Sequence, residues 1–152
     1  MSRQPYIQDV EPGAELTPLV KQPTPRQLVM YAGASGDFCE IHYDRDFALA
    51  QLLPGVILHG ALKCAFLGQL VTDWMGPEGT LRSLSVRYRE MDMPGDTLTC
   101  KGTVIDKDVR AGTVRCEIWL ENGAGVRTTT GEAVVALPTR PAGGTSQLAG
   151  VD

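Results

Sequence analysis

The sequence predicts a single α+β domain in which a curved antiparallel sheet wraps around one central apolar helix. Residues 57–74 are apolar on almost every side of a helix, so this segment needs cover from other elements. The chain that follows alternates apolar and polar residues with a period of two, which is typical of antiparallel strands with one buried face. The domain is expected to cover residues 1–138, with a flexible tail over residues 139–152.

The N-terminal quarter carries one short strand and one helix in this prediction. Residues 1–23 form an extended entry with a short strand over residues 15–20. A helix then begins at Thr24 and Pro25, because threonine can cap the first turn and proline fits the first helical position. The helix ends where the glycines of residues 33–36 let the chain turn away.

Two more helices follow before the strands. Asp44 predicts a second N-cap and a short helix over residues 45–53, which a proline–glycine pair ends. The third helix is the apolar segment over residues 57–74. Polar residues interrupt it, Lys63 among them, so it is expected to be a buried core helix and not a membrane span.

Four strands are predicted after the apolar helix, and turn signals at residues 93–96, 111–112 and 122–123 separate them. The last strand covers residues 126–137. The apolar sides of the first three strands consist of Leu84, Val86, Tyr88, Leu98, Cys100, Val104, Val114, Cys116, Ile118 and Leu120. This succession predicts an antiparallel meander. Because so small a wrap leaves strand edges and helix surface open, the chain is expected to pair with a second copy.

Charge and cysteine usage argue against several classes of function. The formal net charge is −4, and the sequence has no cluster of basic residues with interleaved aromatics, so a nucleic-acid partner is not expected. The four cysteines are scattered without a C-x-x-C pair, so no metal site is expected. Cys100 and Cys116 are predicted to be small buried side chains. The first residues lack the apolar core of a signal peptide, so a cytoplasmic protein without a membrane partner is expected.

The stretch YAGASGDFCEIHYD, residues 31–44, is too polar and too rich in glycine to belong to the core. It places Asp37 and His42 in an irregular loop, where both side chains can turn to one side. Two interpretations of these residues are open. Asp37 can close a turn by accepting backbone N–H groups, and His42 can be a buried imidazole with local hydrogen bonds. Alternatively, the two form an acid–base pair at an active site.

Three stretches in the order YAGASGDFCEIHYD, LPGVILHGALK and LSVRYREMDMPGD resemble the MaoC-like, or R-specific, enoyl-CoA hydratases. The resemblance implies a dimerising hotdog fold. It implies a hydro-lyase that acts on an acyl-CoA or acyl-carrier thioester and needs no cofactor. It also implies that Asp37 and His42 are the catalytic pair, and that the backbone N–H of Gly60 binds the thioester oxygen.

The implied reaction is the reversible, R-specific addition of water to a trans-2-enoyl thioester, which yields a 3-hydroxyacyl thioester. Water must lose a proton near one carbon of the double bond, and the next carbon must gain one. A carboxylate and an imidazole that meet at one water can divide these tasks. Negative charge builds on the thioester oxygen, so a fixed N–H group such as that of Gly60 stabilises the enolate. His59, beside Gly60, is expected at the substrate-binding side in a structural role, with hydrogen bonds to backbone.

One departure from the family pattern lies between the two catalytic candidates. The family typically has Asp-x-Asn-Pro, whereas this chain has Asp37, Phe38, Cys39 and Glu40. Cys39, expected with Gly60 and His59 at the substrate-binding side, can fill the space of the asparagine, but its thiol is a poor hydrogen-bond partner. Without the proline, the approach to His42 is less constrained. We expect activity to survive this change, with its effect on the substrate left open.

Two other functions stay open at this stage. The first is a subunit of a heteromeric acyl or steroid side-chain dehydratase that needs a related hotdog partner chain; the stretch TDWMGP resembles such proteins. The second is a hotdog acyl-CoA thioesterase. The sequence disfavours it, because such enzymes commonly carry a carboxylate on the central helix and residues 60–71 contain no Asp or Glu. Acyl chain length, the thioester carrier and the physiological direction of the reaction are not determined by the sequence.

Overall fold

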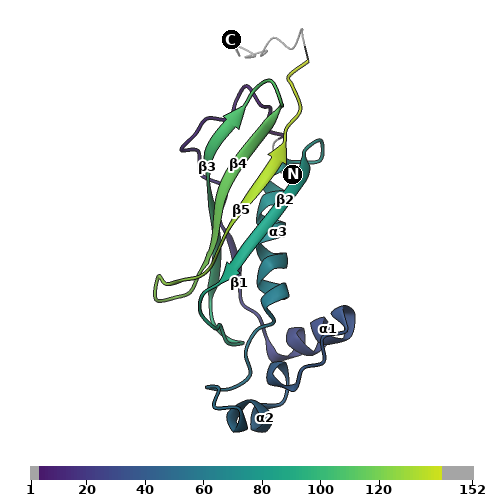
Figure 1. Cartoon of the computed structure of the whole chain (residues 1–152), viewed down its shortest axis with the longest axis vertical. Helices are drawn as coiled ribbons and strands as arrows, with labels where there is room; N and C mark the ends of the chain where they lie inside the picture. The colour runs from purple at the N-terminus through teal and green to yellow at the C-terminus, as the bar shows by residue number, and fades with distance from the viewer. Residues whose placement is uncertain (1–3, 142–152) are drawn as a thin grey trace, which may run out of the picture.

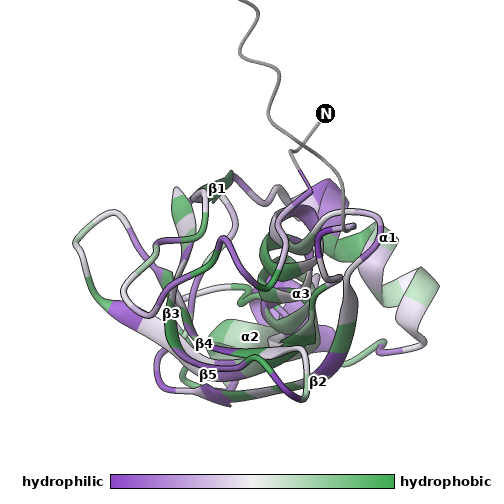
Figure 2. Ribbon diagram, turned by 90° about the horizontal axis from the view of Figure 1, so that it is seen from above, coloured by the Kyte–Doolittle hydropathy of each residue, from purple (hydrophilic) through white to green (hydrophobic). Residues whose placement is uncertain are grey.

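The computed structural model describes residues 4–141. One antiparallel sheet in the order β1-β3-β4-β5-β2 curves around the helix α3 (Figure 1, Figure 2). The helices α1 and α2 lie beyond one end of the sheet, near the start of α3 (Figure 1). The elements are β1 (Leu19–Lys21), α1 (Pro25–Ser35), the 3-10 helix η1 (Glu40–His42), α2 (Arg45–Ala50), α3 (Gly60–Met75), β2 (Thr80–Tyr88), β3 (Leu98–Asp108), β4 (Thr113–Glu121) and β5 (Arg127–Ala136).

Local capping signals place the first two helices as predicted. The hydroxyl of Thr24 accepts a hydrogen bond from the backbone N–H of Gln27 at 3.2 Å, with proline at the first helical position. Gly36 ends α1 in the left-handed conformation, with φ 76°. The carboxylate of Asp44 accepts from the N–H of Phe47 at 3.0 Å and starts α2. This second helix is shorter than predicted and stops at residue 50.

The strand order corrects the predicted four-strand meander. Strands β3, β4 and β5 do form a meander, but β2 pairs with β5 and not with β3. The chain therefore crosses from β2, at one edge of the sheet, to β3 through residues 89–97. A tight hairpin needs only about two to five residues. The longer connection here leaves the end of β2 and passes close to the start of α3, because the N–H of Leu58 donates to the carbonyl of Asp92 at 2.9 Å.

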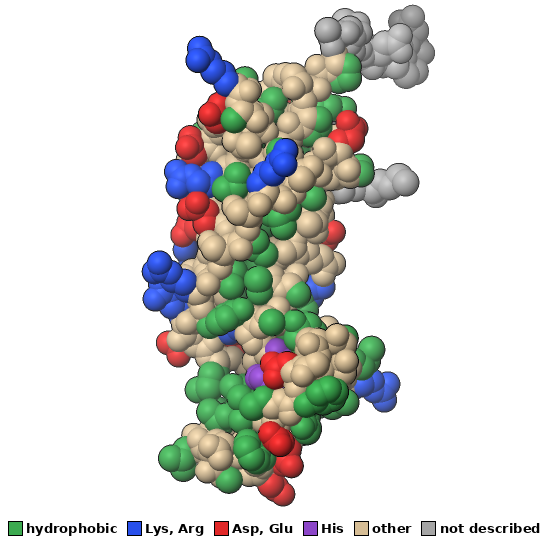
Figure 3. Space-filling model, turned by 45° about the vertical axis from the view of Figure 1, so that its right-hand side comes forward, with side chains coloured by type: hydrophobic (Ala, Val, Ile, Leu, Met, Phe, Trp, Pro, Cys, Tyr) green, Lys and Arg blue, Asp and Glu red, His purple; other side chains and the backbone are tan. Residues whose placement is uncertain are grey.

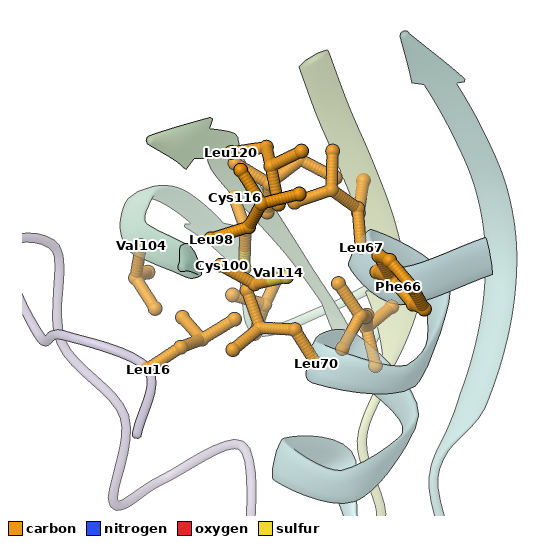
Figure 4. Close-up of a cluster of buried hydrophobic side chains, with 14 of the residues drawn as sticks. Leu16, Phe66, Leu67, Leu70, Leu98, Cys100, Val104, Val114, Cys116 and Leu120 are labelled. Carbon is orange, nitrogen blue, oxygen red and sulfur yellow. The ribbon is translucent and has the colours of Figure 1, made fainter. Parts of the chain in front are cut away.

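The apolar side chains of the strands and of α3 form one core (Figure 4). The period-two pattern is confirmed for β3 and β4, where the predicted apolar residues are all buried: Leu98, Cys100, Val104, Val114, Cys116, Ile118 and Leu120. In β2 the pattern holds less well. Leu84 and Val86 are half-buried, whereas Tyr88, at the end of this edge strand, is 52% exposed.

Helix α3 differs from the prediction in its start and in its surroundings. It begins at Gly60 and not at residue 57, so His59 is the residue that precedes its first turn. The sheet covers one side of α3, where Leu62, Phe66, Leu67, Leu70 and Val71 are buried. The opposite side is exposed along Ala61, Ala65, Gln69 and Thr72. A single curved sheet cannot enclose a helix completely, so the apolar stripe that is covered is narrower than the sequence predicts.

The chain ends differ in part from the prediction. The N-terminal strand is β1 at residues 19–21, with an isolated bridge between Glu15 and Thr103 in place of a longer strand. Of the tail predicted over residues 139–152, residues 142–152 lie outside the described part. Arg140 is held, because its guanidinium donates to the carboxylate of Asp9 at 2.6 Å. No helix in residues 4–141 is both long and apolar enough to cross a membrane.

Candidate active site

Asp37 lies in the loop between α1 and α2, directly after the glycine that ends α1. One oxygen of its carboxylate, Oδ1, accepts a hydrogen bond from the N–H of Cys39 at 3.3 Å. The other oxygen, Oδ2, faces Nε2 of His42 at 3.8 Å. Asp37 therefore closes a turn and also points at the second catalytic candidate, so the two interpretations of this residue are compatible. Its side chain is 47% exposed.

His42, at the end of η1, is buried and has a defined orientation. Its Nδ1 lies 2.8 Å from the carbonyl oxygen of Ile57. A carbonyl only accepts, so Nδ1 carries the proton and donates this hydrogen bond. In the neutral ring the lone pair then lies on Nε2, the atom that faces Asp37. The separation of 3.8 Å is too long for a direct hydrogen bond, but one water molecule can bond to both groups.

His59 packs against His42 directly before α3. The two imidazoles stack with their centroids 3.8 Å apart, and the ring of Tyr31 meets His59 edge-on at 4.9 Å. Nε2 of His59 donates to the backbone carbonyl of Asp37 at 3.3 Å. Burial, followed by the nearby His42, lowers the pKa of His59 below its ordinary value and so favours the neutral ring. The hydrogen bond from Nε2 ties His59 to the backbone of the Asp37 loop.

The residues Asp37, His42 and His59 could also offer ligands to a metal ion, since one ligand atom from each lies within 4.8 Å of the others. Nδ1 of His59 is buried without a hydrogen-bond partner. Nδ1 of His42 and Nε2 of His59 already form hydrogen bonds with backbone carbonyls. The atoms without a hydrogen-bond partner are Oδ2 of Asp37, Nε2 of His42 and Nδ1 of His59, and the first two face each other at 3.8 Å.

Gly60 is the first residue of α3, and its N–H belongs to the helical turn whose N–H groups have no partner within the helix. The ring of Tyr88 covers its α-carbon, because a Cβ at this position would lie 2.9 Å from Cε2 of that ring. Glycine therefore keeps the backbone close to the aromatic ring. The helix N-terminus also places a partial positive charge here, which favours an anionic oxygen.

Cys39 shares the loop but makes no side-chain hydrogen bond that would replace the asparagine of the family pattern. Its thiol is exposed and does not cap η1. Its backbone carbonyl accepts from the N–H of His42 at 3.1 Å, so it helps to form the turn that presents the imidazole. The backbone, and not the thiol, is what Cys39 contributes to this loop.

Sequence reasoning missed two charged residues next to the site. Lys63, in the first turns of α3, is 3% exposed, and Asp92, in the connection from β2 to β3, is 2% exposed. Nζ of Lys63 lies 2.7 Å from a carboxylate oxygen of Asp92. The available signal was a lysine within a helix otherwise predicted to be buried. Its partner could not be found, because it comes from a segment whose position depends on the strand order.

The pair of Asp37 and His42 reaches the surface mainly through the carboxylate: the side chain of Asp37 is 47% exposed and that of His42 is 9% exposed. Figure 3 shows histidine atoms at the surface where the α1–α2 part meets the rest of the molecule, with hydrophobic side chains around them. Phe38, the residue after Asp37, and Tyr88, whose ring lies against Gly60, are 60% and 52% exposed. The site within one chain is therefore accessible and incompletely covered.

Comparison with known proteins identifies the family. Residues 8–133 match the family model of the MaoC-like domain. The chain belongs to the MaoC-like family. Its curved antiparallel sheet around one helix is the hotdog fold, as predicted.

Two relatives match this MaoC-like chain over different lengths. The β subunit of 3-oxo-4,17-pregnadiene-20-carboxyl-CoA hydratase from Mycobacterium tuberculosis is 33% identical over 92 residues, which cover 60% of this chain and 71% of the relative. The (R)-specific enoyl-CoA hydratase from Rhodospirillum rubrum is 26% identical over 140 residues, which cover 89% of this chain and 93% of the relative.

Solved structures agree with this grouping. The R-hydratase PhaJ1 from Pseudomonas aeruginosa superimposes with a TM-score of 0.81 and 25% identity, over 89% of this chain and 86% of that chain. A chain of the ChsH1-ChsH2 complex from Mycobacterium tuberculosis superimposes with a TM-score of 0.77 and 27% identity, over 84% of this chain and 98% of that chain. The MaoC-like chain is thus similar to an R-hydratase and to a chain of a two-protein complex.

Proposed function

We propose that this MaoC-like protein is a hydro-lyase that adds water reversibly to a trans-2-enoyl thioester and forms the (R)-3-hydroxyacyl thioester. The observation that carries the proposal is the 3.8 Å separation between Oδ2 of Asp37 and Nε2 of His42, with both atoms free to bind one water. Membership in the family and the similarity to an (R)-specific enoyl-CoA hydratase support the same reaction.

Asp37 and His42 handle the protons in this proposal. They hold a water molecule between them and accept one of its protons as its oxygen bonds to C3 of the substrate. The pair then supplies a proton to C2, so one water is consumed and both side chains return to their starting protonation states. The hydrogen bond from Nδ1 of His42 to Ile57 keeps Nε2 directed at the reacting water. Only protons and water move, so the reaction requires no redox cofactor.

The backbone N–H of Gly60 stabilises the intermediate. When water adds at C3, negative charge moves through C2 to the thioester oxygen. An N–H donor fixed at the start of α3 binds this oxygen more tightly in the transition state than in the substrate. Removal of one donor of this kind typically costs about 10²–10³ in kcat. We assign the recognition of the thioester carbonyl to Gly60 and the support of the loop to His59 and Cys39.

A second copy or a related hotdog chain is proposed to cover the exposed side chains beside Asp37. The exposure of Phe38 and Tyr88 supports this arrangement. A second candidate function follows from it: the chain is one subunit of a heteromeric hydratase for an acyl-CoA or a steroid side chain. The specific observation in favour is its similarity to a hydratase β subunit and to a chain of a two-protein complex.

The test is the hydration of crotonyl-CoA, and of a longer 2-enoyl-CoA, by the purified chain alone. Loss of the enoyl-thioester absorbance is followed, the configuration of the product is determined on a chiral column, and release of free thiol is monitored in parallel. We expect an (R)-3-hydroxyacyl-CoA product and no thiol. Thiol release without hydration would contradict the proposal and favour a thioesterase.

The assignment of the pair is tested with Asp37→Asn and His42→Ala. Each is expected to lower kcat by about 10²–10⁴, the range typical of a lost general acid or base. The matched control is Asp46→Asn, which removes an exposed carboxylate from α2 and is expected to leave kcat unchanged. An inactive wild-type chain that gains activity only with a related hotdog subunit would support the second candidate.

A further inference from the structure

A buried ion pair lies one helical turn from the proposed oxyanion donor. Nζ of Lys63 donates to a carboxylate oxygen of Asp92 at 2.7 Å and to the backbone carbonyl of Glu90 at 2.8 Å. The hydroxyl of Thr128, at the start of β5, donates to the same oxygen of Asp92 at 2.7 Å. These three side chains, called the Lys63 network below, are all buried.

Stability alone is a weak reason for such an arrangement. The removal of two charges from water is costly, and apolar side chains of similar volume are often as stable or more stable. A buried polar network with satisfied hydrogen bonds does, however, fix the relative positions of the segments that it joins. The role of the Lys63 network is therefore better judged from the segments that it joins than from its contribution to stability.

The network joins the connection between β2 and β3 to the start of α3. The backbone N–H groups of Arg89 and Glu90 donate to the carbonyl of Thr128 at 2.9 and 3.1 Å, which fixes the first part of the connection on β5. The carbonyl of Asp92 then accepts from the N–H of Leu58 at 2.9 Å. Asp92 thus binds the pre-helix segment through its backbone while its carboxylate binds Lys63 on the helix itself.

The same pre-helix segment also holds the proposed acid–base pair. The N–H of Ile57 donates to the carbonyl of Ile41 at 3.1 Å, and the carbonyl of Ile57 accepts from Nδ1 of His42 at 2.8 Å. Leu58 is the next residue, and Gly60 follows two positions later. A shift of Leu58 away from Asp92 therefore moves the support of the imidazole and the N–H of Gly60 together.

We propose that the Lys63 network is a positioning device that sets the N–H of Gly60 against Asp37 and His42. Lys63, Asp92 and Thr128 are positioning residues in this inference, which rests on the proposed hydratase function. Its side chains form their hydrogen bonds with one another and with the carbonyl of Glu90, and none with Asp37 or His42. Displacements of about 1 Å in such a site cost about 100-fold in rate, so a network that fixes two catalytic elements at once affects kcat more than substrate binding.

Two isosteric variants test the inference in the full chain. Asp92→Asn removes the charge, and Thr128→Val removes the hydroxyl donor with little change of shape. We expect kcat to fall roughly 100-fold in Asp92→Asn and roughly tenfold in Thr128→Val, with KM changed less than about threefold in both. If Asp92→Asn does not fold, Thr128→Val decides.

Two controls separate positioning from general destabilisation. Val114→Ala makes a cavity in the core at β4, and Lys101→Met breaks the partly exposed ion pair with Glu121. Both are expected to keep the wild-type kcat per folded molecule. Thr128→Val and Asp92→Asn variants that fold and also keep the wild-type kcat would overturn the inference, even if they unfold as easily as Val114→Ala.

A second readout does not depend on turnover. The chain contains only two histidines, so each imidazole gives its own assignable C–H signals in an NMR spectrum. Both Asp92→Asn and Thr128→Val are expected to shift the signals of His42, and Val114→Ala and Lys101→Met to leave them in place. If the wild type hydrates no enoyl thioester, either alone or with a related hotdog subunit, the proposed function fails, and these signals alone decide whether the network positions His42. Unchanged signals would overturn the inference.

Discussion

The imidazoles of His42 and His59 stack with centroids 3.8 Å apart and an angle of 22° between the ring planes. Each ring donates one hydrogen bond to a backbone carbonyl, from His42 to Ile57 and from His59 to Asp37. The bond from His42 therefore orients the segment that leads to His59, and the bond from His59 orients the loop that leads to His42. A second positive charge within this stack is unfavourable, and His59 is the more deeply buried of the two.

The stability of the protein is expected to fall as the pH drops below about 6.5, the ordinary pKa of histidine. Burial and the nearby His42 lower the pKa of His59 in the folded state, so below this pH the unfolded state binds the proton first. The free energy of unfolding should fall by at most about 1.4 kcal/mol per pH unit from this group. Urea unfolding between pH 5 and pH 8 measures it. In His59→Phe this part of the pH dependence should disappear; an unchanged slope would assign it to other groups.

Gly60→Ala is expected to destabilise the protein by about 1 kcal/mol. The new methyl group would lie 2.9 Å from Cε2 of Tyr88, so the ring must move. The ring is half exposed and can yield, which limits the cost. Urea unfolding of Gly60→Ala in the wild type and in Tyr88→Ala forms a double-mutant cycle. In the Tyr88→Ala background, Gly60→Ala should leave the free energy of unfolding almost unchanged. An equal destabilisation in the wild type and in Tyr88→Ala would mean that the ring is not the obstacle.

Gly131→Ala in β5 is expected to be more damaging, at about 2–3 kcal/mol. The added Cβ would collide with the backbone carbonyl of Ser85 in the paired strand β2, and a backbone atom in a sheet cannot move aside alone. The matched control is Gly33→Ala in α1, where a Cβ meets no described atom within 4 Å. This control should stabilise by about 0.5–1 kcal/mol through helix propensity. Equal effects of the two substitutions on urea unfolding would mean that the collision with the carbonyl of Ser85 is not what destabilises Gly131→Ala.

Thiol labelling is expected to distinguish Cys39 from the core cysteines. Burial raises the pKa of Cys100 and of Cys116 to about 12, so little thiolate is available on either at pH 8. The thiol of Cys39 is exposed in the loop of Asp37. A chromogenic disulfide should therefore react rapidly with Cys39 in the native protein, slowly with the half-buried Cys64, whose pKa burial raises, and with the two core thiols only in denaturant. Cys39→Ser should remove the rapid phase, and a rapid phase that persists would refute this order of reactivity.

Features that depend on neighbouring residues were predictable from the sequence. Thr24 and Asp44 cap helices as expected, because a capping hydrogen bond joins residues three positions apart. The alternation in β3 and β4 identified the buried faces, because side chains on a strand point to opposite sides in turn. One irregular segment carries Asp37 and His42, and its resemblance to the family motif made the two residues the catalytic candidates.

The tertiary structure decided what depends on residues far apart in the sequence. It placed β2 beside β5, and this order carries Asp92 to Lys63 and Leu58. It also stacked the ring of His59 on that of His42. The sequence could not predict this stack, because it leaves no periodic signal. Local hydrogen bonds and periodicity act within a few residues, whereas strand order depends on how the whole sheet closes around α3. The sequence therefore determined the elements and the catalytic candidates, and the packing of the sheet determined what holds them in place.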